Sequence, residues 1–444
     1  MLFTVLFALL IVAASAYFIF GKGDSGEKEK PARNNDATEE ELAPTNRKKK
    51  KGKKKSIMVS NPVGGGKKKK KAGVPSHPRF LNMVKGHSQN IDVCALSPNG
   101  KWLATSGGDQ QLRVTQVNSG SKRVSGGEAI YFRINIDRDT ISSLSWASDS
   151  STIVAAMEGT KDVCYFRMRK NKNAAADGSG FKYELIELKK RRFSTAHKGP
   201  VQSCIIDTAY SSPVIVTAGD VSADKSICVW GNDGMKLGQV SNPYSSQGVR
   251  LSTDGHFIAP RCDSTEIKLF EIVRKKVKGQ PEAMFEAVNP KSVMTLSGLH
   301  KKKVTDVVFG GHDAPVAHGD CDRCVTCGLD GSIGIWGIDV HFKFKEDPKL
   351  LWGGMPHGDA AYSKIALSPD GRRLAASTFS GDIHLFTIKT VGEESCKCTP
   401  DIVIESKDAG GTGLKYMEFS PSCQELYTCG IMSKHAYVWD VKKQ

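Results

Sequence analysis

The strongest constraint on the fold is a short pattern that recurs along residues 79–444. It consists of an aliphatic residue, any residue, a second aliphatic residue and an aromatic residue. The clear copies are ICVW ending at Trp230, IKLF at Phe270, IGIW at Trp336, IHLF at Phe386 and AYVW at Trp439, and the weaker ones are LRVT ending at Thr115 and VCYF at Phe166. Self-similarity at a period of tens of residues is typical of repeat architectures, so we expect one structural unit per copy.

A second block precedes each copy and completes the unit. The seven blocks are LATS, IVAA, IVTA, FIAP, CVTC, LAAS and LYTC, which begin at Leu103, Ile153, Ile215, Phe257, Cys324, Leu374 and Leu426. Tight-turn sequences lie before three of them: SPNG at Ser97, STDG at Ser252 and SPDG at Ser368. Asn-Gly and Asp-Gly between apolar runs indicate hairpins. Each unit is therefore predicted to be an antiparallel sheet.

These units resemble the repeats of the WD40 family, whose members fold as β-propellers of four-stranded blades. The Trp-Asp pair that names the family occurs at Trp439-Asp440, whereas Gly follows Trp230 and Trp336. The resemblance implies an all-β, seven-bladed WD40 propeller over residues 79–444. The chain stops four residues after Asp440, so the last blade lacks an outer strand. We predict that RFLNMV at residues 79–84 supplies it, because a paired edge leaves no free strand.

Three His–Asp pairs recur in the repeats and could suggest catalysis or metal binding. They are His87 with Asp109, His197 with Asp224 and His300 with Asp330, each Asp six residues before the third-strand landmark. In WD40 repeats such residues fasten the turns of a blade together, so the resemblance makes them structural, together with Trp230, Trp336 and Trp439. Ser380 and Ser433 replace the Asp in the last two repeats, which predicts weaker networks there.

The positions of the cysteines and the absence of known catalytic motifs predict a protein without a cofactor, a metal ion or enzyme activity. The run HGDCDRCVTC contains His318, Cys321, Cys324 and Cys327, and one of its Cys pairs has zinc-ligand spacing. Cys324 and Cys327 fall in strand register, however, where Cys acts as a small buried apolar residue. Cys396 and Cys398 are interpreted as a loop pair. No nucleophile elbow, HExxH sequence or Walker loop is present.

The first 20 residues are apolar and uncharged, which predicts a transmembrane signal anchor over 1–20, with residues 2–20 in the bilayer. A signal peptide cleaved after Ala16 is the alternative, but no basic segment precedes the apolar run. Lys22, Lys28, Lys30 and Arg33 follow the segment, so the remainder should face the cytosol. A single-pass membrane protein is therefore expected.

Residues 21–78 form a predicted disordered basic linker, poor in aromatic residues. Its lysine runs are candidate RNA or lipid contacts, and so is a triplet in the propeller. The candidates are Lys48, Lys49, Lys50, Lys51, Lys53, Lys54, Lys55, Lys67, Lys68, Lys69, Lys70, Lys71, Lys301, Lys302 and Lys303. Such runs are compatible with three roles: a solvated spacer, a contact with anionic lipid, or a contact with RNA phosphates. Lys189–Arg192 and Arg274–Lys276 are further basic clusters, placed in connections between strands.

The architecture as a whole resembles the membrane-anchored, transducin beta-like branch of the WD40 family. The most specific part is the first repeat, KGHSQNIDVCALSPNGKWLATSGGDQQLRV. The resemblance implies a single-pass protein of the endoplasmic reticulum membrane whose propeller faces the cytosol. It also implies protein partners, including the reticulum's stress-activated translation-inhibiting kinase, and no small-molecule substrate. It predicts a scaffold in stress signalling and translation control. An adaptor that tethers messenger RNA or ribosomal components to the membrane is the alternative.

Overall fold

The computed structural model describes residues 75, 77–117, 131–170, 183–210, 213–219, 224–242, 246–276, 285–287, 291–311, 321–340, 346–391, 395–409 and 413–442. The predicted anchor at 1–20 and all but the last residues of the predicted linker lie outside them. Within the described residues no helix is both long and apolar enough to cross a membrane.

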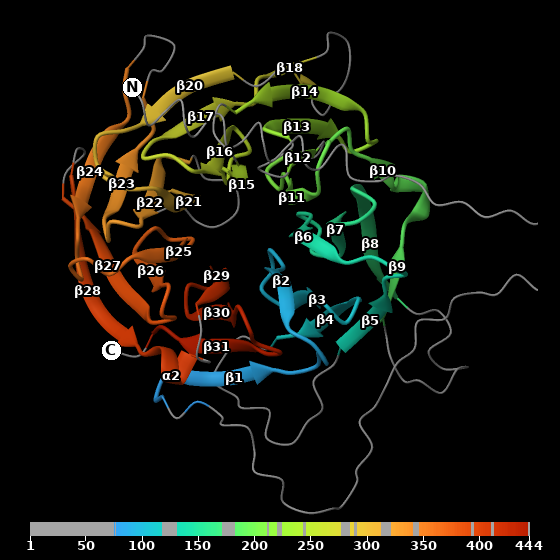
Figure 1. Cartoon of the computed structure of the whole chain (residues 1–444), viewed down its shortest axis with the longest axis horizontal. Coiled ribbons are helices and arrows are strands. Elements are labelled where there is room, and N and C mark those ends of the chain that lie inside the picture. Colours follow the sequence, from blue (N-terminus) through green and yellow to red (C-terminus); the bar gives the residue numbers. More distant parts are fainter. Residues whose placement is uncertain are drawn as a thin grey trace, which may run out of the picture. The chain divides into compact units, whose positions relative to one another are not determined.

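The described strands form seven antiparallel blades arranged around a central opening (Figure 1). Blade one contains β2 (Ile91–Leu96), β3 (Trp102–Gly107), β4 (Gln111–Gln116) and β5 (Tyr131–Asn135). Blade two contains β6 (Ile141–Trp146), β7 (Thr152–Met157), β8 (Asp162–Lys170) and β9 (Tyr183–Glu187), followed by the 3-10 helix η1 (Lys189–Arg191) and β10 (Phe193–Ser194). Blade three contains β11 (Val201–Ile206), β12 (Val214–Gly219), β13 (Ser226–Gly231) and β14 (Lys236–Ser241).

The remaining blades follow the same plan. Blade four contains β15 (Ser246–Leu251), β16 (Phe257–Cys262), β17 (Ile267–Glu271) and β20 (Lys291–Leu296), with the ribbon β18 (Arg274–Lys276) and β19 (Phe285–Ala287) in between. Blade five contains β21 (Val304–Gly310), β22 (Arg323–Gly328), β23 (Ile333–Gly337) and β24 (Lys349–Gly354). Blade six contains β25 (Tyr362–Leu367), β26 (Arg373–Thr378), β27 (Ile383–Thr390) and β28 (Cys396–Ile404).

Blade seven closes the ring with a strand from the other end of the described chain. It contains the short helix α2 (Ser406–Ala409) in its entry loop, then β29 (Leu414–Phe419), β30 (Glu425–Gly430) and β31 (Ala436–Asp440). Its outer strand is β1 (Phe80–Val84), which pairs antiparallel with β31 from Phe80 opposite Trp439 to Val84 opposite Ala436. The predicted closure by residues 79–84 is thus confirmed.

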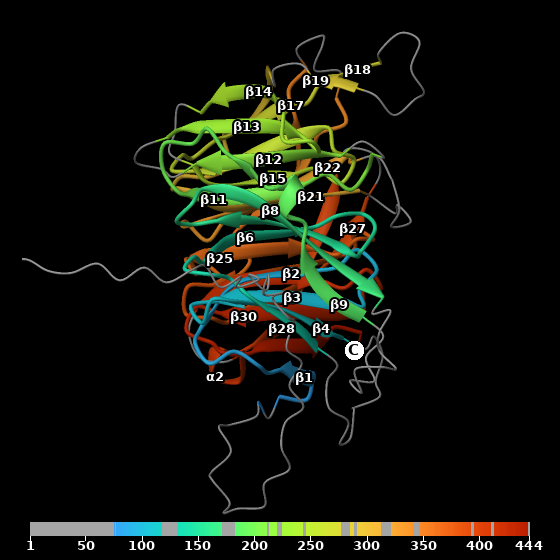
Figure 2. The ribbon, with the colours of Figure 1, turned by 90° about the vertical axis from the view of Figure 1, so that its right-hand side faces the viewer.

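Position in the blade explains the composition of each strand. The second strands are buried on both faces and are continuous apolar runs, such as VIVTAG in β12. The outer strands are more exposed, and in β24 (KLLWGG) every residue is exposed or half-buried. The three predicted tight turns end in Gly100, Gly255 and Gly371, whose φ values of 67°, 68° and 67° suit glycine. In Figure 2 the strands run from one face of the ring to the other.

Two sequence interpretations need correction. Cys396 and Cys398 are not a loop pair: both are buried in β28, where they pack against the cluster that contains Phe386. The cluster Arg274–Lys276 is not a plain connection, because it forms β18 and pairs with β19.

Candidate docking face and central channel

The predicted His–Asp pairs lie at one end of the ring and fasten the blades. In blade three His197 Nδ1 is 2.8 Å from Asp224 Oδ2, and its Nε2 is 2.8 Å from Thr217 Oγ1. The indole of Trp230 donates to the same Thr217 hydroxyl at 2.8 Å. Burial lowers the pKa of His197, whereas the adjacent Asp224 would raise it. A neutral, buried His linked on both sides acts as a brace between two turns.

The other predicted pairs vary this arrangement. His87 contacts Asp109 at 2.9 Å and Thr105 at 2.8 Å, but Thr115 stands where Trp230 stands in blade three. In blade five Ser332 intervenes. Its hydroxyl is 2.6 Å from His300 Nδ1 and donates to Asp330 at 2.5 Å, which leaves the carboxylate 3.6 Å from the ring. In blade five the Ser332 hydroxyl therefore bridges His300 and Asp330, which are not hydrogen-bonded directly.

Trp336 and Trp439 keep the third contact of the network. Trp336 donates to Thr326 and Trp439 to Thr428, both at 2.9 Å. The Thr residues escaped the sequence interpretation, although each occupies the same place in its second strand. Asp139 of blade two was also missed: its carboxylate accepts N–H bonds from Gly159 at 2.8 Å and Thr160 at 3.0 Å and so joins two turns without a His.

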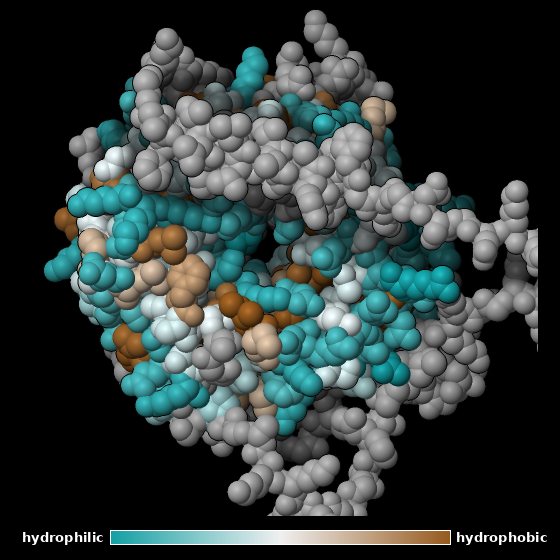
Figure 3. Space-filling view, in the orientation of Figure 1, coloured by the Kyte–Doolittle hydropathy of each residue, from teal (hydrophilic) through white to brown (hydrophobic). Residues whose placement is uncertain are grey.

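We call the end of the ring that carries His87, His197 and His300 the network face. Turns between second and third strands all lie there because the strands alternate in direction. Four exposed apolar side chains belong to this face: Met355 (48% exposed), Phe379 (55%), Ile431 (43%) and Met432 (66%). In Figure 3 apolar residues, drawn brown and tan, gather beside the central opening over the sector where Figure 1 places β25 and β29. Exposed lysines accompany them, namely Lys301, Lys302 and Lys434.

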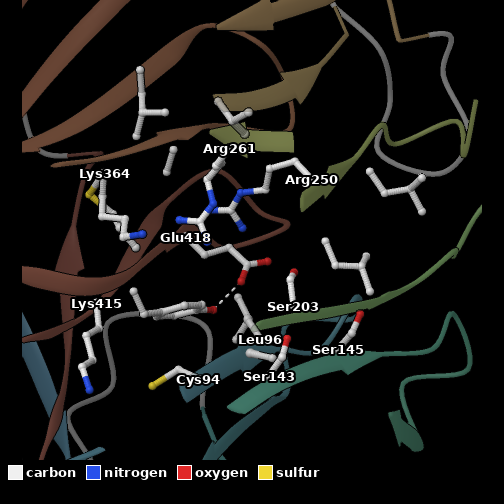
Figure 4. A pocket seen from close by; sticks show the side chains of 18 of the residues that line it. Cys94, Leu96, Ser143, Ser145, Ser203, Arg250, Arg261, Lys364, Lys415 and Glu418 are labelled. Carbon is white, nitrogen blue, oxygen red and sulfur yellow. Dashed lines mark hydrogen bonds between the residues drawn. The ribbon is translucent and has the colours of Figure 1, made fainter. Parts of the chain in front are cut away.

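A central channel of about 1130 Å³ runs between the seven first strands. The apolar patch borders its mouth, because Phe379 and Ile431 also line the channel. The walls differ in character. Blades two and three contribute hydroxyls such as Ser143, whose Oγ accepts the N–H of Cys204 at 2.9 Å. Blades four to seven contribute charges, including Arg250, Arg261, Lys364 and Glu418 (Figure 4).

Asp306 organises the charged wall. Its carboxylate is fully buried and lies 3.3 Å from Arg250 Nη2 and 3.7 Å from Arg261 Nη1. Burial alone would raise the pKa of Asp306, but Arg250, Lys364 and Arg261 lower it to about 2. At neutral pH it is therefore an anion that holds two guanidinium groups together.

Comparison with known proteins agrees with this architecture. The family model for the WD domain, G-beta repeat, matches residues 78–115. Transducin beta-like protein 2 of Homo sapiens is 26% identical over 324 residues, which cover 72% of this chain and 65% of the human protein. Its Mus musculus counterpart is 26% identical over 326 residues, covering 73% and 66%. The chain therefore contains a match to the WD40 repeat and resembles transducin beta-like protein 2.

A solved structure agrees with the propeller fold of this chain. The propeller domain of Myceliophteria thermophila Cps50 (Swd1) superposes with a TM-score of 0.53 at 12% identity, covering 82% of this chain and 99% of that domain. The match to the two curated relatives spans just under two thirds of their length.

The propeller separates the predicted basic clusters instead of collecting them on one rim. Lys301 and Lys302 are exposed on the network face, and Lys303 pairs with Asp263. Lys189–Arg192 lies at the outer edge of blade two, where Arg192 pairs with Asp162 at 2.6 Å. Arg274 is buried against Asp207 at 2.5 Å, near the turn between β11 and β12. The predicted lysines between 48 and 71 lie outside the described residues.

The described part of the cysteine-rich run places its Cys side chains inside the propeller. Cys321, Cys324 and Cys327 are buried, and His318 lies outside the described residues. Among the residues that the structure describes, no three His, Cys, Asp or Glu side chains are grouped to hold a metal ion. Burial raises the pKa of the Cys327 thiol to about 12, so the thiol stays protonated.

Proposed function

We propose that this WD40 protein is a non-catalytic scaffold that docks protein partners on its network face. The observation that carries the proposal is the exposed group Met355, Phe379, Ile431 and Met432 beside the channel mouth. Large flexible and aromatic side chains of this kind are enriched in protein interfaces. Because exposed Lys301, Lys302 and Lys434 accompany the patch, it fits a partner segment that combines apolar and acidic residues.

We further propose that the propeller is held at the cytosolic face of the endoplasmic reticulum membrane. The apolar residues 1–20 and the basic residues after them support this, as does the resemblance to transducin beta-like protein 2. Tethering raises the local concentration of whatever the patch binds. Stress signalling and translation control, with the stress-activated translation-inhibiting kinase as one partner, are the processes that this placement would serve.

Proximity labelling from the full chain in cells tests the docking face. A variant with Phe379→Ser and Met432→Ser should lose most of its protein neighbours. Met235→Ser is the matched control, because Met235 is 63% exposed in the turn between β13 and β14, at the opposite end of the ring. Equal neighbour sets for both variants would contradict the proposal.

The same experiment distinguishes a protein-docking scaffold from an RNA-binding adaptor. A variant with Gln in place of every Lys in 48–55 and 67–71 should keep its protein neighbours if the patch is responsible. If that variant alone loses RNA-associated neighbours, and capture collapses as salt is raised to physiological strength, phosphate contact by the lysine runs is the main activity. Protease protection of the propeller in intact microsomes would contradict the cytosolic placement.

A further inference from the structure

The charged wall of the channel contains three cations that docking on the network face does not require. They are Arg250 on β15, Arg261 on β16 and Lys364 on β25. Figure 4 shows both guanidinium groups and the ammonium group directed into the same space. Arg250 and Arg261 lie on paired strands of blade four, whereas Lys364 comes from blade six, so the three cations meet because both blades line the channel.

Arg261 reaches the channel through a local exception to the blade plan. Arg261 belongs to a second strand, and the residues at the equivalent position in the other blades are buried. The facing residue on β15 is Gly248, with φ of 131°, a conformation that residues with a side chain rarely adopt. A Cβ there would lie 2.5 Å from Arg261 Nη2. At the same position of the first strand, blade three has Ser203 and blade six has Lys364. Gly248 has no side chain there and so leaves room for the guanidinium group of Arg261.

The two guanidinium groups have more donors than the protein uses. Arg250 Nη2 approaches the Asp306 oxygens at 3.3 and 3.4 Å, longer than a charge-assisted hydrogen bond usually is. Arg261 Nη2 donates to the carbonyl of Gln247 at 2.8 Å. The Nε atoms of Arg250 and Arg261 are buried without a hydrogen-bond partner among the described residues. Because these Nε atoms are inaccessible, a ligand in the channel would be bound by the Nη groups, whose long contacts with Asp306 suit competition by an acceptor with several oxygens.

The carboxylates of the channel are already engaged. Asp306 lies between the two arginines, and Glu418 accepts a hydrogen bond from Tyr416. Near the mouth, Lys303 pairs with Asp263, and Lys415 pairs with Asp92 at 2.7 Å. Burial and the positive charge of Arg261 lower the pKa of Lys364 to about 8, as expected where like charges are crowded. A bound anion would relieve this repulsion.

We propose that the channel binds a small phosphate-bearing anion through Arg250, Arg261 and Lys364. Phosphate oxygens match the planar fork of a guanidinium and the point charge of a lysine. The cavity of about 1130 Å³ exceeds a single phosphate, so phosphorylated small molecules are the ligand class. Such a ligand would bridge blades four and six and stabilise the closed ring by mass action. The inference is independent of the proposed docking function.

Calorimetric titration of the purified full chain with inorganic pyrophosphate tests the site. Physiological salt is used because screening over about 8 Å weakens contact with the lysine runs. Lys364→Gln and Arg261→Gln should each weaken binding about tenfold, since each removes a charge-assisted contact. Lys101→Gln is the control that removes an exposed charge elsewhere, and it should bind like the wild type.

Asp306→Asn supplies a test of opposite sign. Removing the competing carboxylate should tighten pyrophosphate binding several-fold, even if the variant is less stable, which a merely structural role would not produce. Absence of binding to the wild type, or equal affinity of wild type and Lys364→Gln, would overturn the proposal. If Asp306→Asn does not fold, the comparison of Lys364→Gln with Lys101→Gln decides. Binding lost only when the lysine runs are neutralised would also overturn it.

Discussion

Blades three and seven have the same four strands but are held together differently. In blade three, Trp230, Thr217, His197 and Asp224 form one hydrogen-bonded network within a short stretch of chain. Blade seven keeps only the contact of Trp439 with Thr428. Its Ser433, in the place of Asp224, donates instead to the nearby carbonyl of His435 at 2.7 Å.

Contacts with β1 take the place of the missing network in blade seven. The rings of Phe80 and Trp439 pack edge to face with centroids 5.8 Å apart. The Arg79 carbonyl accepts the N–H of Asp440 at 2.7 Å, and the Arg79 guanidinium donates back to the Asp440 carbonyl. Local polar networks and distant strand pairing are therefore alternative ways to stabilise one blade, and they should fail under different perturbations.

Deletion of residues 79–85 should have the largest effect. It removes the outer strand of blade seven and exposes Trp439, now fully buried, together with the edge of β31. We expect cooperative loss of the propeller, detected by circular dichroism and thermal melting. Phe80→Ala should be milder, at about 3 kcal/mol, because the strand can still pair. An unchanged melting curve for the deletion would contradict closure by β1.

His197→Ala should have the next largest effect. The change leaves Asp224 and Thr217 without their shared partner in a buried site, which costs about 2–3 kcal/mol in the free energy of unfolding. Chemical denaturation measures it. Hydrogen exchange should show that backbone amides lose protection mainly in strands β11–β14. Equal loss of protection in β29–β31 would show that the network does not act within its own blade.

Acid should weaken the braces that contain His. Burial lowers the pKa of His87, His197 and His300 below the unfolded value of 6.5, so the unfolded chain binds protons first. The free energy of unfolding should therefore fall as pH drops below about 6.5. A second fall is expected below about pH 4, because the pKa of Asp224 is lowered to about 2. His197→Gln should flatten the first fall, and an identical slope would refute its assignment.

Ser433→Ala should have the smallest effect. The hydroxyl bonds only within its own turn, to the carbonyl and the N–H of His435. Its loss should cost about 1 kcal/mol in the free energy of unfolding. A cost as large as that of His197→Ala would mean that blade seven contains a polar brace after all, and denaturant titration of both variants side by side would reveal it.

The repeat pattern predicted the propeller and the three His positions, because those features depend on local sequence. The closure was predicted from the missing outer strand of the last repeat and the apolar segment at 79–84. The channel could not be predicted in this way. Arg250, Asp306 and Lys364 are each the single charged residue of a short first strand in three different repeats, and only ring geometry brings them together. The sequence signal was weak but present: a charge in the middle of a first strand, as in VTDVVFG around Asp306. Ser332, which bridges His300 and Asp330, required side-chain positions.

The pairing of β1 with β31 also affects how the chain is made. Arg79 and Asp440, which bond to each other, are 361 residues apart. During synthesis β1 is made before any blade is complete, but its partner β31 is added only after the strands of the other six blades. Those six blades can assemble in order from the amino-terminal side, whereas the seventh is completed only when β31 is available. Until then the edge of β1 and the edge of the unfinished sheet stay open to wrong partners, so nascent chains should depend on chaperones until β31 has been added.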